Sequence, residues 1–259
     1  MTIPELHATA PRGPEGRPLL VLGPSLGTST ILWDDAAALL EGEFRVVAWD
    51  LPGHGLSPAA TEPFTVAELA DGVARVLDEL GEERCYYAGD SLGGATGLEL
   101  ARRHPSRVIA VADICSAAVF GTPQGWHERA ALARTQGTAS LVVVSAQRWF
   151  APGSIERHPE ISGRLLHSLR DADDESYALC CEALAAFDAR PWLGELSVPV
   201  HVLWGEHDVV VSHHAAREIA DGVQHGSFTA ITDAAHLAPA EQPAVVAAAL
   251  VALAAEVRA

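Results

Sequence analysis

The sequence predicts an α/β fold with a mainly parallel sheet flanked by helices, and two observations lead to this class. Short β-rich runs alternate with segments of helical periodicity along most of the chain. Strands separated by helices pair in parallel, because each helix returns the chain to the same end of the sheet. The 259 residues, 49% of them hydrophobic and 20% charged, suit one large globular domain.

The elements can be placed in order along the chain. The helix at 66–80 is the best defined, because Thr65 and Glu68 form a capping box at its start and Gly81 ends it. The predicted strands are residues 19–22, 45–49, 85–88, 108–114, 200–204 and 227–231. The predicted helices that alternate with them are residues 30–40, 66–80, 92–103, 213–220 and 242–257.

The alternation stops between residues 120 and 190. This stretch contains successive helical patterns and no convincing strand, with helices expected at residues 124–136, 139–150, 160–170 and 174–186. The sequence therefore predicts a core made of residues 1–119 and 191–259, with a helical cap inserted at residues 120–190.

Composition excludes several chemistries. The net charge is −17, and all 17 basic residues are arginines. Without lysine there is no Schiff base, no pyridoxal phosphate anchor and no P-loop lysine, and the acidic balance opposes binding to nucleic acid or an anionic membrane. We expect a small-molecule partner and no cofactor.

Cysteine usage and hydropathy indicate the compartment. Cys85, Cys115, Cys180 and Cys181 show no C-x-x-C spacing and are expected to be buried, reduced thiols. The first 17 residues are polar and broken by prolines, and no apolar run of 18 residues follows. We therefore expect a cytoplasmic protein without an export signal or a membrane span.

Ser91 is the candidate nucleophile. It stands at the centre of Gly89-Asp90-Ser91-Leu92-Gly93, a G-x-S-x-G pattern that follows a predicted strand and opens a predicted helix. That context is typical of a nucleophile elbow, in which small flanking residues permit a sharp turn that exposes the serine hydroxyl. The alternative is a glycine-rich structural turn.

His236 is the candidate base, since a serine hydroxyl is a poor nucleophile unless a histidine removes its proton. It lies in residues 232–239, a loop of small residues between the last strand and the final helix, where the imidazole can approach Ser91.

Among the other histidines, His213 and His214 are neighbours in the sequence. They point in different directions on a predicted helix and form a poor metal pair. We expect no metal.

Asp208 is the carboxylate expected to orient this base. It follows the predicted strand 200–204 at the carboxyl edge of the sheet, where active-site groups of open α/β sheets collect. It also gives the chain order serine, acid, histidine. Glu206 lies beside it and Asp113 ends another strand, so both stay open as alternatives.

An oxyanion hole needs two backbone N–H groups. The amide of Leu92, directly after the nucleophile, is one expected donor. The glycine-flanked residues 23–27 follow the first strand and offer the amide of Leu26 as the second, with Ser25 near the substrate.

The G-x-G within residues 50–57 lacks the third glycine of a dinucleotide fingerprint, so this turn is interpreted as structural.

The turn at residues 50–57, the elbow around Ser91, Asp208 and His236 occur in this order, and with these four motifs the whole chain resembles the α/β-hydrolase superfamily. Further segments are Pro24-Ser-Leu-Gly-Thr28, Leu32-Trp33, Trp126-His-Glu-Arg129, Gln147-Arg-Trp-Phe150 and Tyr177-Ala-Leu-Cys-Cys-Glu182. In these segments the chain resembles the 3-oxoadipate enol-lactonases of protocatechuate catabolism. The resemblance implies hydrolysis of a small anionic enol-lactone to 3-oxoadipate through an acyl-enzyme.

The substrate that this resemblance implies carries a carboxylate, and a buried charge needs a cation. Because lysine is absent, Arg148 beside Trp149 is the first candidate for this cation, and Arg129 or Arg134 is the next. Trp126 is expected to form a wall for the lactone ring.

A carboxylesterase or a carbon–carbon bond hydrolase with the same triad is the alternative enzyme. A ligand receptor of the same fold is the non-enzymatic alternative.

Overall fold

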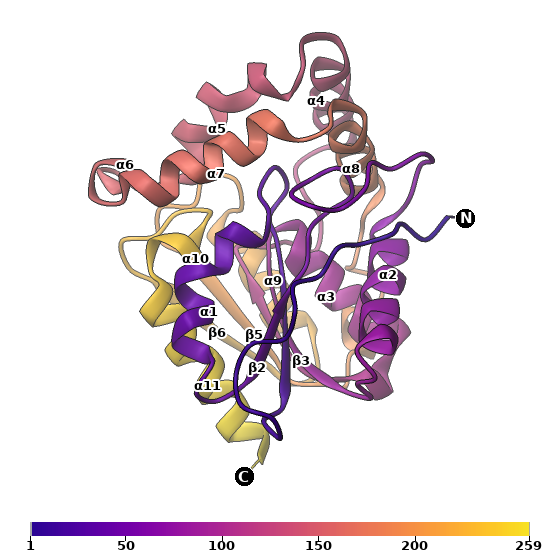
Figure 1. Ribbon diagram of the computed structural model, residues 1–259, viewed down its shortest axis with the longest axis vertical. Coiled ribbons are helices and arrows are strands. Elements are labelled where there is room, and N and C mark those ends of the chain that lie inside the picture. The colour runs from indigo at the N-terminus through magenta and orange to yellow at the C-terminus, as the bar shows by residue number, and fades with distance from the viewer. Residues whose placement is uncertain (1, 259) are drawn as a thin grey trace.

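The computed structural model describes residues 2–258, and at its centre lies a six-stranded sheet whose neighbouring strands are all parallel (Figure 1). The strand order is β2-β1-β3-β4-β5-β6. The predicted α/β class is therefore confirmed. The strands are β1 (Leu19–Gly23), β2 (Arg45–Ala48), β3 (Cys85–Asp90), β4 (Val108–Ile114), β5 (Val200–Gly205) and β6 (Gly226–Ile231).

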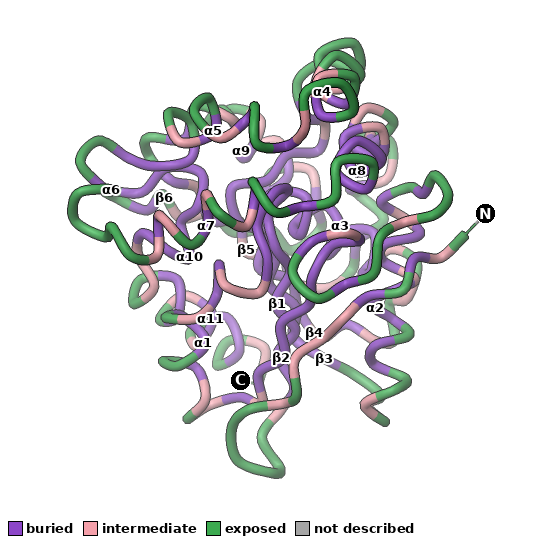
Figure 2. The backbone as a smooth tube through the Cα atoms, turned by 45° about the horizontal axis from the view of Figure 1, so that its top comes forward, coloured by how far each residue is buried: buried purple, intermediate pink, exposed green. Residues whose placement is uncertain are grey.

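Helices cover both faces of the sheet. On one face α1 (Asp34–Leu40) packs against α11 (Pro243–Arg258), and on the other α2 (Val66–Glu79) packs against α3 (Leu92–Arg103) (Figure 1). The capping box expected at the start of α2 is present. Every residue of β1 and β3 is buried, as expected for strands covered on both sides (Figure 2). A further core helix, α9 (His213–Gly222), packs on β5 and β6.

The start of two predicted helices differs in the structure. The first predicted helix begins as a 3-10 turn over Thr30–Trp33 before α1. The last, predicted at residues 242–257, corresponds to α11, and an unpredicted short helix α10 (Ala238–Glu241) precedes it, with Gln242 between them in a non-helical conformation. Pro243 explains this break, because proline disfavours helical geometry in the residue before it and is accepted in the first turn of a new helix.

The chain between β4 and β5 forms helices that lie over one end of the sheet (Figure 1). Arg164 in this cap forms an ion pair of 2.7 Å with Asp34, and the backbone N–H of Asp173 donates to the carbonyl of Gly53. The single turn α6 was not predicted from the sequence. The cap helices are α4 (Pro123–Gln136), α5 (Val142–Trp149), α6 (Ser154–Arg157), α7 (Pro159–Asp171) and α8 (Asp174–Ala186).

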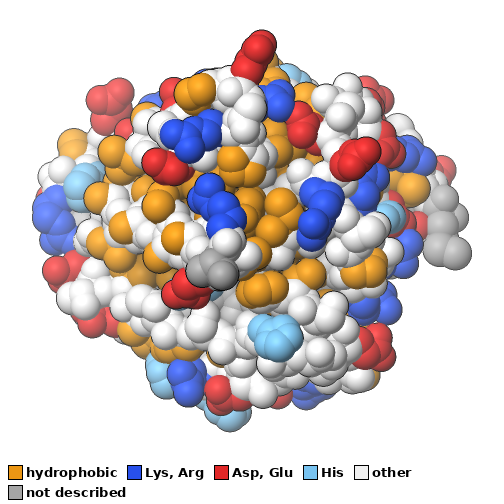
Figure 3. Space-filling view, turned by 90° about the horizontal axis from the view of Figure 1, so that it is seen from below, with side chains coloured by type: hydrophobic (Ala, Val, Ile, Leu, Met, Phe, Trp, Pro, Cys, Tyr) orange, Lys and Arg blue, Asp and Glu red, His pale blue; other side chains and the backbone are white. Residues whose placement is uncertain are grey.

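The surface away from the cap is mixed in character. On this face, acidic and basic side chains of the described residues are interspersed with hydrophobic ones (Figure 3). Among residues 2–258, no helix combines the length and the hydropathy needed to cross a membrane.

Candidate active site

Ser91 occupies a strained turn between β3 and α3. Its φ of 56° and ψ of −114° are costly for a residue with a side chain, on the order of 1–3 kcal/mol. Two hydrogen bonds hold this backbone: the Ser91 N–H donates to the carbonyl of Ile114 (2.8 Å), and the Ser116 hydroxyl donates to the carbonyl of Ser91 (2.9 Å). The turn therefore projects the Ser91 side chain off the end of the sheet.

The glycines of the G-x-S-x-G pattern are required by close backbone contacts. A Cβ atom on Gly89 would lie 2.2 Å from the carbonyl group of Gly93, and one on Gly93 would lie 2.6 Å from the carbonyl group of Gly23. Real Cβ atoms do not approach backbone so closely. The strand, turn and helix that the sequence predicts around Ser91 are all present.

His236 and Asp208 form a buried hydrogen-bonded pair. His236 Nδ1 lies 2.9 Å from Asp208 Oδ2, and both side chains are almost completely buried. The other oxygen of Asp208 accepts the backbone N–H groups of Val210 (2.7 Å) and Val211 (2.9 Å). These bonds fix the carboxylate, which in turn fixes the orientation of the imidazole.

A cavity of about 220 Å³ under the cap brings the candidate residues together. It is small beside the roughly 300–1,000 Å³ of most ligand pockets, which favours a small substrate. Ser91 and His236 both face it, and so do five of the six residues predicted to contact the substrate. Its lining residues are Ser25, Leu26, Ser91, Phe120, Gly121, Thr122, Gly125, Trp126, Arg129, Ser145, Arg148, Trp149, Tyr177, Val210 and His236.

The two predicted oxyanion donors lie on adjoining loops. The Gly93 N–H donates to the carbonyl of Pro24 (3.0 Å), which joins the turn after Ser91 to the loop that carries Leu26. Within the described residues, the amides of Leu26 and Leu92 donate no hydrogen bond. Both N–H groups are therefore available to an oxygen of a bound substrate.

The turn at residues 50–57 supports the same loop through His54. Its Nε2 accepts the backbone N–H of Gly27 (3.3 Å), and its Nδ1 lies 2.9 Å from the carbonyl of Pro52. Burial lowers the pKa of His54 to about 4, so the ring is neutral, with the proton on Nδ1. Sequence reasoning missed this role, since the contact with Gly27 spans 27 residues.

The three candidate arginines have different surroundings. Arg129 donates to the Tyr177 hydroxyl (2.8 Å) and to the Ser145 hydroxyl (3.1 Å), so neutral oxygens hold it beside the cavity. Arg148 lines the cavity and is exposed. Neither forms an ion pair with an acidic side chain within the described residues.

The expectation that Arg134 contacts the substrate is wrong. Although Arg134 is on α4 like Arg129, it does not line the cavity. It forms ion pairs with Glu175 and Glu182 on α8, and its charge is neutralised there. The sequence could not show this, because it does not reveal which face of α4 meets α8.

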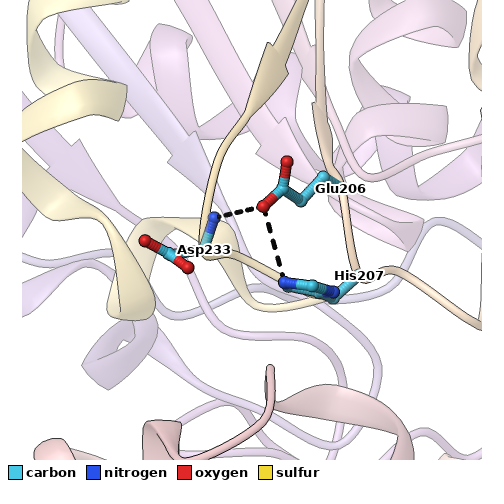
Figure 4. A group of neighbouring side chains, drawn as sticks. All are labelled: Glu206, His207 and Asp233. Carbon is cyan, nitrogen blue, oxygen red and sulfur yellow. Dashed lines mark hydrogen bonds and ion pairs between the residues drawn. The ribbon is translucent and has the colours of Figure 1, made fainter.

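The two alternative acids do not contact His236. Glu206 is exposed, accepts the backbone N–H of Asp233 (3.0 Å) and lies 3.5 Å from His207 (Figure 4). Each of Glu206, His207 and Asp233 has one potential metal-ligating atom, and these three atoms lie within 4.8 Å of one another. Through its hydrogen bond to the Asp233 N–H, Glu206 supports the turn at Asp233, whose φ is 56°. Asp113 is fully buried, and neither of its oxygens accepts a hydrogen bond within the described residues.

Asp90, which ends β3 directly before Ser91, and Asp113 on the neighbouring strand β4 both carry buried carboxyl groups. Burial raises the pKa of Asp113 to about 7. Burial, together with the negative charge of Asp208, also raises the pKa of Asp90. A carboxyl whose pKa is higher in the folded protein than in the unfolded chain stabilises the fold at low pH, and this contribution is lost as the pH rises through the folded value.

We expect the substitution Asp113→Asn to reduce the pH dependence of stability. Between about pH 4 and pH 7 the wild type loses about 1.4 kcal/mol of unfolding free energy per pH unit through Asp113, because only the unfolded chain releases the proton there. Urea unfolding of both proteins across this range measures the difference. Below about pH 4 the difference in unfolding free energy between the two proteins should be constant. Parallel profiles throughout would show that Asp113 ionises normally.

The chain is similar to known hydrolases along most of its length. A sequence profile of the alpha/beta hydrolase fold matches residues 18–243. The chain is 36% identical to 3-oxoadipate enol-lactonase 2 of Acinetobacter baylyi, over 89% of this chain and 86% of the relative. The enol-lactonase of Burkholderia xenovorans LB400 superposes with a TM-score of 0.92 at 34% identity, covering 96% of each chain. A malate-bound thermophilic esterase from Thermogutta terrifontis superposes with a TM-score of 0.90 at 25% identity, covering 98% and 94%.

Proposed function

Since the chain belongs to the alpha/beta hydrolase fold family and is a hydrolase of ester bonds, we propose that it opens 3-oxoadipate enol-lactone to 3-oxoadipate. One observation carries this choice: the small cavity that contains Ser91 and His236 also holds two arginines without acidic partners among the described residues. A neutral ester does not need them, whereas a lactone with an acetate side chain does. The relatives named as enol-lactonases support the same substrate.

The first half of the proposed reaction forms an acyl-enzyme. His236 takes the proton of Ser91 through Nε2 while the serine oxygen attacks the lactone carbonyl. The amides of Leu26 and Leu92 stabilise the negative oxygen that develops. Asp208, held by two backbone N–H groups, keeps the proton of the imidazole on Nδ1. The ring C–O bond then breaks and the acyl group stays on Ser91.

The second half releases the product. The leaving group is an enol, which is more acidic than an alcohol, so its protonation by His236 is less demanding. The enol tautomerises to the ketone. His236 then activates a water molecule, which hydrolyses the acyl-enzyme and restores Ser91. The product is the 3-oxo dicarboxylate.

Recognition of the substrate carboxylate is assigned to Arg129 and Arg148. The two neutral hydroxyls that hold Arg129 fix its direction without cancelling its charge. Arg148 stands beside Trp149 at the end of α5, where both line the cavity. Malate, bound in the similar esterase, is likewise a small carboxylate.

We expect Arg129→Ala and Arg148→Ala each to raise KM for the lactone about 10- to 100-fold, because a hydrogen bond to a charged group contributes about 1.5–3 kcal/mol. Hydrolysis of p-nitrophenyl acetate, which has no carboxylate, should change little. Steady-state kinetics with both substrates measure this selectivity.

Arg134→Ala is the matched control for these variants. It removes one positive charge from the same helix as Arg129 but outside the cavity, and its ion pairs with Glu175 and Glu182 lie at the surface. Its KM for both substrates should stay near the wild-type value. Equal losses on the lactone and the neutral ester in the Arg129 and Arg148 variants would contradict the proposed recognition.

A further inference from the structure

The cap is bonded directly to the loop that carries His236. The carbonyl of Trp149, the last residue of α5, accepts the backbone N–H groups of His236 (3.1 Å) and Leu237 (3.2 Å). The side chain of the same Trp149 lines the cavity. One cap residue therefore touches the substrate space with its side chain and the His236 loop with its backbone.

Glu241 makes a second connection between the same two segments. Its side chain is buried, with the residue only 3% exposed, at the end of α10. One carboxylate oxygen accepts the N–H of Ala151 in the cap (2.7 Å), and the other accepts the N–H of Ala235 (2.7 Å). Ala235 directly precedes His236. The carboxylate therefore bridges cap residues 149–151 and loop residues 235–237.

A buried carboxylate is a costly bridge. Burial raises the pKa of Glu241, and the N–H groups of Ala151 and Ala235 oppose that rise by stabilising the charged form. Hydrogen bonds to an ionised acceptor are roughly twice as strong as neutral ones. An apolar residue at position 241 would fill this space but would leave two buried N–H groups without acceptors, at about 1–3 kcal/mol each.

We propose that Glu241 is a positioning residue. By bonding both Ala235 in the His236 loop and Ala151 in the cap, it fixes the His236 imidazole beside Ser91. The inference rests on the proposed role of His236 as the base, but not on the identity of the substrate. Among the hydrogen bonds of the described residues, loss of the carboxylate leaves only those to the Trp149 carbonyl to connect the two segments, so both become less well fixed. His236 is then positioned less accurately, and so are Arg148 and Trp149, because they lie three and two residues before Ala151, which the carboxylate holds.

The test compares Glu241→Ala and Glu241→Gln with the wild type on p-nitrophenyl acetate and on the enol-lactone. For Glu241→Ala we expect kcat to fall about 10- to 100-fold on both substrates, because a misplacement of about 1 Å costs about 100-fold. KM for the lactone should rise as well. Glu241→Gln keeps one acceptor oxygen, so its losses should be smaller.

Glu68→Ala is the matched control. Glu68 is also a buried carboxylate, 6% exposed, and it accepts the backbone N–H of Thr65 (2.8 Å). It caps α2 and is not among the residues that line the cavity. Its removal should lower the melting temperature and leave kcat unchanged when measured well below that temperature. A residue that only stabilises the fold would behave in the same way at position 241.

A kcat within twofold of the wild type on both substrates in the folded Glu241→Ala variant would overturn the proposal. If Glu241→Ala does not fold, the glutamine variant decides, and hydrogen exchange of the Ala151 and Ala235 amides accompanies its kinetics. Faster exchange at either amide together with a lower kcat supports the proposal. If the wild type hydrolyses p-nitrophenyl acetate but not the lactone, the proposed substrate fails while the ester still tests Glu241.

Discussion

Ser91→Ala is expected to lower kcat by about a millionfold on the lactone and on p-nitrophenyl acetate, as the loss of a serine nucleophile does in other triads. The change removes one oxygen atom and leaves the cavity otherwise as it is. The strained turn is retained, since alanine meets the same backbone penalty as serine at a φ of 56°. Binding of 3-oxoadipate, measured by calorimetry, should therefore survive.

The combination of the two measurements separates the possible outcomes. Lost turnover with preserved binding assigns the nucleophile to Ser91. Residual turnover above about one part in a hundred would contradict an acyl-enzyme on this residue. A wild type that binds the ligand without any turnover would identify a receptor of the same fold.

Asp208→Asn should lower kcat about 10,000-fold with little change in KM. The asparagine oxygen is expected to keep the N–H groups of Val210 and Val211, because the site offers it two donors there. Its NH₂ group then faces His236 Nδ1, which must become an acceptor. The proton moves to Nε2, and the ring can no longer take the proton of Ser91.

Glu206→Gln is the control for this variant. Glu206 is two residues away, exposed, and bonded to the turn at Asp233 rather than to His236. Its kcat should stay within a few-fold of the wild type. If the two substitutions have similar effects, Asp208 does not determine the tautomer of His236.

Local patterns were enough to predict the fold and to single out most residues of the candidate site. A nucleophile elbow needs a strand, two glycines and a helix within a few residues, and Ser91 shows all of them in the sequence. Likewise, the capping box at Thr65 and Glu68 defined the start of α2. His236 and Asp208 could be placed because the strands before them end at a common edge of the sheet.

Features that depend on packing between distant segments could not be predicted. The sequence analysis did not single out Glu241, and its proposed role rests on a hydrogen bond from the Ala151 N–H, 90 residues away. Arg129 and Arg134 share a helix, yet one lines the cavity and the other pairs with α8. The signal that could have indicated Glu241 is a lone acid in the apolar stretch after His236, where a buried charge needs partners.

The central claim is that the arginine-lined cavity selects an anionic enol-lactone, and the most direct test is the loss of ultraviolet absorbance of enzymatically generated 3-oxoadipate enol-lactone on addition of the wild-type protein. p-Nitrophenyl acetate and a meta-cleavage product serve as competing substrates. We predict fast turnover of the lactone and weak activity on the other two. An inert lactone beside efficient hydrolysis of either competitor would contradict the assignment and leave the chemistry of Ser91 intact.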